Sequence, residues 1–355
     1  MSTKYSNIKN MIKEIETKEQ WDIYLNSCIR KTFLQSFQWG QFQKSLNKDI
    51  KYLAIFDNEN LLGIALCIKE KSLFGNYIYI PRGPLLTNEN EDVYKKVLIE
   101  IKEYFKDVIS IKIDPAYTQE NSLAKVPSRI GFIHSINFIQ SETNWIINLE
   151  GNTEEELLNW CREHGMVDNY PKYIRKARRD GVDISFSKEK SDWELFHKYL
   201  TQSGKRKSFE VRSKEYFQNM YDTLSQDDTV RLGIAKRDGN ILAMILIAVD
   251  KNEISCLYSA QTDIDTKLRA PLLLRWECML MGQREGIKRF NNWGVLPEDK
   301  YKPNNPGYGY SQYKRSFGGY LEQLERTYEY PYDRLKNTLQ RIYDWYIKIR
   351  YYKYR

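Results

Sequence analysis

The sequence lacks the short motifs that mark many nucleotide-dependent and ester-cleaving enzymes. Its 355 residues contain no G-x-x-x-x-G-K-[ST] loop, no G-x-G-x-x-G turn after a strand and no G-x-S-x-G elbow. Such patterns cradle phosphates or expose a serine nucleophile. Their absence argues against nucleotide hydrolysis, dinucleotide redox chemistry and serine hydrolysis. It leaves chemistry that depends on positioning and electrostatics.

Histidine and cysteine are scarce and widely spaced. The three histidines share no ligand spacing, and Cys161 with His164 supplies only two candidates where zinc takes about four. The cysteines are odd in number and far apart, which argues against a disulfide framework. We therefore expect no metal site, and a reducing compartment suits the five cysteines, Cys28, Cys67, Cys161, Cys256 and Cys278.

Long apolar segments are also missing. The longest apolar run, Ile241 to Val249, has nine residues, whereas a membrane-spanning helix needs about 20. The first 20 residues are charged throughout and have no apolar centre of the kind found in secretion signals. These features predict a soluble, cytoplasmic protein. The net charge of +8 favours an acidic partner, such as nucleic acid, a phosphorylated substrate or an anionic membrane surface.

Two parts of the chain resemble each other. Residues 51–68 and 230–249 each read as a strand, a tight turn of Asn, Asp or Gly, and an apolar strand. Each hairpin is followed by a third strand, an amphipathic helix and a final strand, the helices near 92–105 and 270–282 and the final strands at 108–114 and 287–294. Short apolar hairpins are common, so chance likeness is the alternative. The shared order favours two copies of one unit.

The predicted fold class is therefore α/β (α+β), with two similar domains whose mixed central sheets are flanked by helices. We place the first domain at residues 1–150 and the second at 151–319. The tail, residues 320–355, contains a closing helix that we expect to pack back on the first domain.

One lysine has unusual neighbours. The stretch "GYGYSQYKRSFGG" sets Lys314 among four aromatic residues, beside Tyr313, and between glycines. A cation in a partly dry aromatic setting can stabilise negative charge that develops during a reaction. An exposed lysine with no special role is the alternative.

A second basic segment suggests a phosphate clamp. In "SGKRKSFEVRSKEYF", Arg206 and Arg212 flank Phe209, and Tyr216 follows Arg212 by one helical turn. A guanidinium and a phenol can hold a phosphate by bidentate and single hydrogen bonds. A solvated, basic helix start explains the same residues equally well.

Three further residues admit two interpretations each. Trp39, in "FLQSFQWGQFQ", faces either a cleft or the core, and the core is the commoner place for tryptophan. Asp114 ends the strand "SIKID" and either orients an amine or satisfies a turn. Tyr258, in "LYSAQ", lies in an apparently central strand, where its hydroxyl must find a partner.

Taken together, these segments resemble the FemABX family of aminoacyl-tRNA-dependent transferases. The resemblance runs in order from about Phe33 to Tyr328 and is carried by "FLQSFQWGQFQ", "YIPRGPL", "SIKIDP", "YIRKARRDGV", "GKRKSFEVRSKEYF", "LYSAQ" and "GYSQYKRSFGGYL". Members of the family have two acetyltransferase-like (GNAT) domains. They transfer an amino acid from its tRNA ester to a stem-peptide amine of a peptidoglycan precursor.

The resemblance implies a role for each matched residue. Lys314 would contact the reacting acyl group, with Tyr313 in place of the usual phenylalanine. Arg212 and Tyr216 would grip the diphosphate of the precursor, with Arg206 as a possible helper. The remaining substrate-binding positions are Tyr258 in the same groove, Asp114 near the acceptor peptide, Trp39, and Gln38, where some members have a phosphate-binding lysine.

The resemblance also implies the partners. Aminoacyl-tRNA would be the co-substrate, with no other cofactor, and the acceptor would be UDP-MurNAc-pentapeptide or lipid II. The basic residues of "YIRKARRDGV" would steer the tRNA through phosphate contacts, and the terminal "IKIRYYKYR" would either touch the inner face of the membrane or pack as an ordinary helix. The chain resembles the compact members of the family, because only "RDGN" occupies the turn where other members insert a coiled-coil arm. We also expect a monomer.

Two other functions are consistent with the same fold. One is an N-acyltransferase that uses an acyl thioester, although the [QR]-x-x-G-x-[GA] loop that binds coenzyme A in acetyltransferases is absent. The other is a non-catalytic module that binds RNA or a cell-wall precursor.

Overall fold

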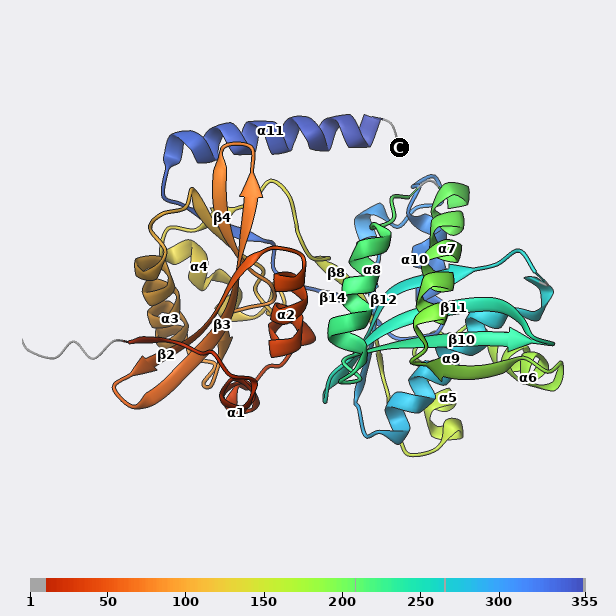
Figure 1. The fold of residues 1–355 in the computed structure, drawn as a ribbon. Helices are drawn as coiled ribbons and strands as arrows, with labels where there is room; N and C mark the ends of the chain where they lie inside the picture. Colours follow the sequence, from red (N-terminus) through yellow and green to blue (C-terminus); the bar gives the residue numbers. More distant parts are fainter. Residues whose placement is uncertain (1–10, 208, 265, 354–355) are drawn as a thin grey trace, which may run out of the picture. The chain divides into compact units, whose positions relative to one another are not determined.

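The structure is a computed structural model that describes residues 11–207, 209–264 and 266–353. It contains two compact units, each with its own sheet (Figure 1). One unit extends to Glu142 and resumes at Gln323, and the other comprises Thr143–Glu322. Residues 1–10 and 354–355, which the predicted domain limits include, lie outside the described residues.

The first unit combines the amino-terminal part of the chain with its carboxyl-terminal segment. Its helices are α1 (Lys18–Ser27), α2 (Phe37–Ser45), α3 (Glu91–Tyr104), α4 (Val126–Arg129) and α11 (Arg334–Lys353), with single turns η1 (Phe33–Gln35) and η2 (Ser122–Lys125). Its strands are β1 (Ile12–Glu14), β2 (Asp49–Asp57), β3 (Asn60–Ser72), β4 (Gly75–Ile80), β5 (Leu85–Leu86), β6 (Ser110–Ile113), β7 (Ile133–His134) and β15 (Tyr328–Pro331). The strand order is β1-β2-β3-β4-β6-β15-β7, with β5 paired to β3.

The second unit is continuous in sequence. Its helices are α5 (Glu154–Glu163), α6 (Tyr170–Arg179), α7 (Lys190–Lys207), α8 (Lys214–Met220), α9 (Ala270–Arg284) and α10 (Tyr308–Arg315), with single turns η3 (Tyr221–Ser225), η4 (Thr266–Leu268) and η5 (Glu298–Lys300). Its strands are β8 (Thr143–Asn148), β9 (Asp183–Ser187), β10 (Val230–Arg237), β11 (Asn240–Val249), β12 (Glu253–Gln261), β13 (Arg289–Gly294) and β14 (Tyr320–Gln323). The strand order is β14-β8-β13-β12-β11-β10-β9.

The two units repeat one topology. In each, a hairpin (β2–β3 or β10–β11) is followed by a third antiparallel strand (β4 or β12), a helix (α3 or α9) and a strand parallel to the third (β6 or β13). Each hairpin even shifts register at the same place, between Ile55 and Phe56 and between Ala235 and Lys236. The predicted fold class, with two similar mixed sheets, is confirmed.

Local sequence explains both hairpins. The turn residues Asn58, Asp238 and Gly239 have positive φ angles of 55°, 49° and 77°, which asparagine, aspartate and glycine adopt more readily than other residues. The strands on either side carry apolar residues that are buried over most of their length. Burial of this apolar surface holds each hairpin in its sheet.

The structure shifts the limits that we predicted for the domains. Strand β8 lies before residue 151 but pairs with β13, so its residues belong to the second sheet. The tail contributes more than a helix, because β15 lies between β6 and β7 in the first sheet. Within the described residues, no helix has both the length and the apolar character needed to cross a bilayer.

Candidate functional site

The centre of the second unit contains a gap between two parallel strands. Strands β12 and β13 pair only from Glu253 to Ser255 and from Arg289 to Asn291, and both continue beyond that point. The side chain of Arg275, from α9, bridges the unpaired parts. Its Nη1 donates to Sγ of Cys256 at 3.2 Å and to Oδ1 of Asn292.

Arg275 is a buried cation without a carboxylate partner. Its exposed fraction is 3%, and no ion pair to it is found among the described residues. Its Cζ lies 5.3 Å and 5.8 Å from the ring centroids of Tyr313 and Phe317. Ring faces offset part of the cost of burying a guanidinium. A positive charge held in this way favours an anion nearby.

The end of β13 is irregular next to this arginine. Its pairing with β8 shifts register between Asn291 and Gly294, and Trp293 has a φ of 62°. Bulges of this kind redirect backbone groups and are common beside functional sites. The consequence here is that the carbonyl of Gly294 accepts a hydrogen bond from Nζ of Lys314 at 2.6 Å.

Helix α10 holds Lys314 in place through the glycines that follow it. Gly318 and Gly319 have φ angles of 80° and 118°. A Cβ atom on either glycine would lie 2.2 Å from a backbone carbonyl oxygen, of Cys161 or of Ile146. The double glycine therefore allows the chain after α10 to approach α5 and β8 closely.

The environment of Lys314 changes its acidity. Burial is the main cause that lowers the pKa of this side chain, and the charge of Arg275 lowers it further, to about 7. The ring of Tyr310 lies 5.4 Å from Nζ, and no carboxylate pairs with Lys314 among the residues described. Near neutral pH the side chain can therefore exist as ammonium or as amine.

Tyr313 lies beside Arg275 rather than beside the ammonium group of Lys314. Its ring meets that of Phe317 edge to face at 5.4 Å, and burial raises the pKa of its hydroxyl. Tyr313 therefore packs against the side chains of Arg275 and Phe317.

Arg212 and Tyr216 of the predicted phosphate clamp lie together at the start of α8. Ser213 caps this helix by accepting a hydrogen bond from the backbone N–H of Tyr216 at 3.3 Å. The exposed guanidinium of Arg212 lies 5.6 Å from the ring of Tyr216. Burial raises the pKa of Tyr216 well above its usual value, and the hydroxyl of Tyr258 adds to this effect. Tyr216 therefore stays protonated and can donate a hydrogen bond.

A register shift brings Tyr258 to this cluster. Leu246 pairs with Tyr258 but the next residue, Ile247, pairs with Cys256, so Leu257 is the extra residue of a bulge. The ring of Tyr258 meets that of Phe217 edge to face at 5.1 Å. Three of the predicted site residues, Arg212, Tyr216 and Tyr258, are thus brought together.

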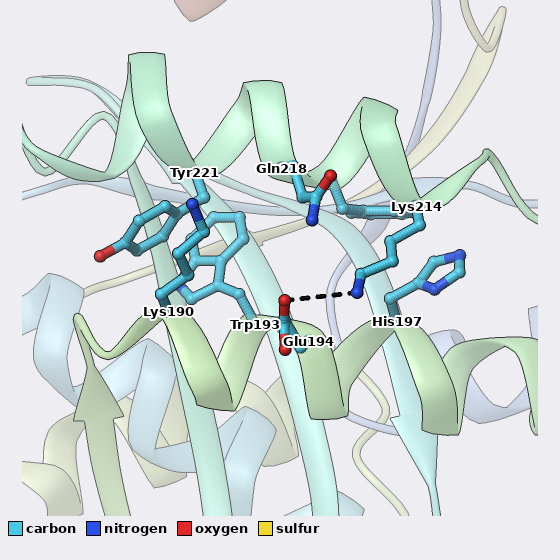
Figure 2. A pocket seen from close by; sticks show the side chains of 8 residues that line it. Lys190, Trp193, Glu194, His197, Lys214, Gln218 and Tyr221 are labelled. Atoms are coloured by element: carbon cyan, nitrogen blue, oxygen red, sulfur yellow. Dashed lines mark ion pairs between the residues drawn. The ribbon is translucent and has the colours of Figure 1, made fainter.

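A small pocket lies between α7 and α8, next to the cluster (Figure 2). Its residues are Lys190, Trp193, Glu194, His197, Lys214, Phe217, Gln218 and Tyr221. Lys214 is paired with Glu194 at 3.3 Å, as Figure 2 shows. His197 lies 3.2 Å from the carbonyl oxygen of Arg212. Because Lys190 and Lys214 already pair with Asp222 and Glu194, we assign no separate anion site to this pocket.

Arg206 is not part of this cluster in the way that we predicted. Its guanidinium pairs with Asp263 and donates to the carbonyl oxygen of Gln261 at 2.5 Å. The residue ties the end of α7 to the end of β12. Its charge is already compensated, whereas that of Arg212 has no carboxylate partner within the described chain.

Asp114, in the first unit, is a buried and fully engaged carboxylate. Its exposed fraction is 1%, and it accepts hydrogen bonds from Tyr79 and, at 2.5 Å, from Thr327. Burial raises the pKa of Asp114, while the nearby charge of Arg82 opposes the increase. Arg82 itself is buried in a left-handed conformation, with a φ of 47°. This arrangement holds the strand end and the carboxyl-terminal segment together.

The residues that we predicted on α2 lie on different sides of that helix. Trp39 is buried, with ring contacts to Phe33 and Phe42 at 5.3 Å and 5.2 Å. The core interpretation of Trp39 therefore has the stronger support. Gln38 is half-buried, and its contact with a phosphate stays a prediction.

Sequence reasoning missed Arg275. The available signal was a single charge inside the apolar run "APLLLRWECMLM", because a helix buried on all sides has no solvated place for it. No group of three or more potential metal ligands occurs among the described residues. All five cysteines are buried and free, and burial raises the pKa of the Cys256 thiol.

Comparison with known proteins agrees with this architecture. Residues 167–315 match the model of an acetyltransferase (GNAT) domain, and residues 16–129 match that of the FemAB family. The crystal structure of FemX aligns with a TM-score of 0.83 at 18% identity, covering 93% of this chain and 100% of that chain. The fold is thus that of a tandem GNAT protein.

The sequence relatives are more specific. The chain is 25% identical over 233 residues to a lipid II:glycine glycyltransferase of Staphylococcus epidermidis, and 25% identical over 235 residues to a protein of the same name from Staphylococcus aureus. Each alignment covers 62% of this chain and 54% of the relative. The chain therefore spans about half the length of the curated relatives that it matches. The chain is thus similar to the FemAB family over residues 16–129 and, at 25% identity, to these glycyltransferases.

Proposed function

We propose that this protein is an aminoacyltransferase that moves an amino acid from aminoacyl-tRNA to a stem-peptide amine of a peptidoglycan precursor. The match of residues 16–129 to the FemAB family supports the reaction, and the names of the relatives support lipid II as the acceptor. The structural observation that carries the proposal is the pair Lys314 and Arg275, two cations without carboxylate partners among the described residues.

The pair suits the chemistry of an activated ester. The acceptor amine attacks the ester carbonyl, a tetrahedral oxyanion forms, and the bond to the ribose oxygen then breaks. The Lys314 ammonium has three N–H groups, one of which is bonded to Gly294. The others are available to the oxyanion, and a pKa of about 7 allows one proton to pass to the departing ribose oxygen. The attacking amine releases a proton to solvent, and the Lys314 amine takes one up from solvent, so the step balances and the ammonium is restored.

The cluster on α8 would bind the diphosphate of the precursor. The charge of Arg212 has no carboxylate partner in the described chain, and the hydroxyl of Tyr216, which stays protonated beside Tyr258, lies in the same cluster. UDP-MurNAc-pentapeptide and lipid II both carry a diphosphate, so the same cluster would serve either acceptor. Aminoacyl-tRNA is the proposed co-substrate, and the mechanism requires no other cofactor.

The first test is transfer by the full chain. The protein is incubated with a mixture of charged tRNAs and either UDP-MurNAc-pentapeptide or lipid II, and the products are read by mass spectrometry. We expect an increment of one amino acid on one acceptor. Lys314→Met should lower the rate about 10²–10³-fold, the usual cost of losing an oxyanion donor, while Lys302→Met, an exposed control, should not. Equal rates for Lys314→Met and the parent, with the fold intact by circular dichroism, would refute the role of Lys314.

The second test concerns the clamp. Arg212→Ala should raise the KM for the precursor about tenfold with little change in kcat, because a charged hydrogen bond is lost that binds substrate and transition state alike. Lys214→Ala, two residues away and already paired with Glu194, is the matched control. An unchanged KM in Arg212→Ala would remove the cluster from the precursor site.

The match to an acetyltransferase (GNAT) domain favours a second candidate, transfer from an acyl thioester. The same assay distinguishes it when acetyl-CoA replaces the charged tRNAs. Product from acetyl-CoA, with none from any charged tRNA, would favour the thioester enzyme over the tRNA-dependent one. Precursor or RNA binding without any product would favour the non-catalytic module.

A further inference from the structure

Helix α11 packs on the first unit with its polar side. Asn337 and Gln340 are buried, and Nδ2 of Asn337 donates to Oε1 of Glu329 at 3.2 Å. Asp344 also faces the unit, 3.6 Å from Nζ of the buried Lys112. The ordinary arrangement of a surface helix, with its apolar side toward the core, is therefore reversed.

Two long basic side chains also lie on the side of α11 that faces the first unit. Arg341 donates to the carbonyl oxygen of His134 at 2.9 Å, and Lys348 donates to that of Ile136 at 3.0 Å. Arg341 also pairs with Glu329. Most of the polar groups beneath α11 thus find partners within the first unit, which fixes which side of the helix faces the unit.

The outer side of α11 is apolar over nearly the whole helix. One stripe repeats every three or four residues, the spacing that places side chains on a single helical face. The five members of this outer stripe, with their exposed fractions, are Leu335 (72%), Leu339 (40%), Ile342 (57%), Tyr346 (53%) and Ile349 (40%). Trp345 and Tyr343 flank the stripe and are also exposed.

The exposed charges on α11 itself are basic, although Lys336 pairs at 3.3 Å with Asp333, which lies just before the helix. The exposed charged residues described on α11 are Arg334, Lys336 and Arg350, whereas the single acidic residue, Asp344, faces the unit. The segment that Lys348 contacts continues into Phe138 and Ile139, which are exposed too. The surface is therefore apolar, aromatic at its edges and basic.

We propose that the outer stripe of α11 binds the surface of an anionic phospholipid membrane. An apolar stripe that enters the acyl boundary, aromatic rings at its margins and basic groups near phosphates match what such a surface requires. A second copy of the chain fits less well, because helices that pair through a stripe favour opposite charges beside it. Here two basic margins would face each other.

Membrane binding by α11 would serve the proposed transfer reaction, and this role rests on the proposed function. An acceptor such as lipid II is confined to a membrane surface, so a protein held there would meet it at high local concentration. Membrane binding itself can be measured without any transfer reaction. A failure of the transfer reaction and a failure of membrane binding are therefore separate results.

The experiment measures co-sedimentation of the full chain with vesicles. Vesicles of phosphatidylglycerol and phosphatidylcholine are compared with vesicles of phosphatidylcholine alone. We expect binding to the anionic vesicles that weakens with salt, and at least a tenfold loss in Ile342→Ser/Ile349→Ser. The matched control, Ile23→Ser/Leu73→Ser, removes two apolar side chains of the first unit that are more exposed than those of the test variant, at 67% and 66%, and should bind like the parent.

A second readout separates membrane binding from damage to the fold. Ile342→Ser/Ile349→Ser should keep its transfer rate with soluble UDP-MurNAc-pentapeptide and lose rate with lipid II presented in vesicles. Equal vesicle binding by this variant and the parent would overturn the proposal. So would equal binding to neutral and anionic vesicles, or a dimer that the substitutions dissociate. Absence of binding by a monomeric parent would also overturn it.

Discussion

The pKa of Lys314 depends on Arg275, a residue that takes no part in the proposed reaction steps. Burial lowers this pKa most, and the positive charge of Arg275 lowers it further, to about 7. If the ammonium form stabilises the oxyanion, kcat must fall as the pH rises through this value. Arg275 would then set the position of the falling limb without contacting substrate.

This dependence predicts the effect of removing the charge. In Arg275→Gln the repulsion is lost, so the pKa of Lys314 rises and the falling limb of kcat against pH moves to higher pH. Arg275→Lys keeps the charge and should leave the limb near its original position. Each profile is measured at saturating substrates on protein whose fold is verified by thermal melting. A limb that stays at the same pH in a folded Arg275→Gln would show that Arg275 does not tune Lys314.

The sequence indicated the setting of Lys314 but not its cause. Aromatic residues and glycines around it suggested a partly dry site, and the structure shows the lysine partly buried beside Tyr310. Its immediate neighbour Tyr313 packs on Arg275 instead, because adjacent residues of a helix point in different directions. The distance along the chain between Arg275 and Lys314 hid their proximity, which depends on the gap between β12 and β13.

At the scale of elements, local patterns were reliable where they carried turn chemistry. The two hairpins, α3 and α9 lie close to their predicted residues, because Asn, Asp and Gly fix the turns and apolar periodicity fixes the faces. The strands β7 and β15 were not predicted. Both strands are short. They are stabilised by pairing with strands that are distant in sequence, since β15 pairs with β6 on one side and with β7 on the other.

Charge patterns on helices were less informative than apolar ones. The basic residues of α6 suggested a surface for tRNA, yet Arg178 pairs with Glu154 and Glu277, and Lys176 pairs with Asp180. Arg178 thus ties α6 to α5 and α9. The exposed Arg175 keeps its charge available to a phosphate, since no carboxylate pairs with it in the described part of the chain. A run of cations in sequence does not show which of them are already neutralised.

At the scale of the whole molecule, the first unit is built from two separate segments, one before and one after the second unit. Strand β15 lies between β6 and β7, so the first sheet requires residues that follow the entire second unit. Tyr328 is almost fully buried there, and Glu329 faces the buried Lys112 at 3.7 Å. The second unit contains all of its own sheet except the last residue of β14.

This connectivity predicts unequal effects of truncation. A chain ending at Glu322 loses an interior strand of the first sheet, which exposes apolar surface and leaves Lys112 without its partners, in a domain whose net stability is only about 5–15 kcal/mol. Hydrogen exchange should then show residues 11–142 unprotected, with protection retained over 143–322. A chain ending at Asp333 keeps β15 and loses only α11, so part of the first unit should stay protected. Full protection of residues 11–142 in the shorter chain would mean that β15 is dispensable and that the first sheet is complete without it.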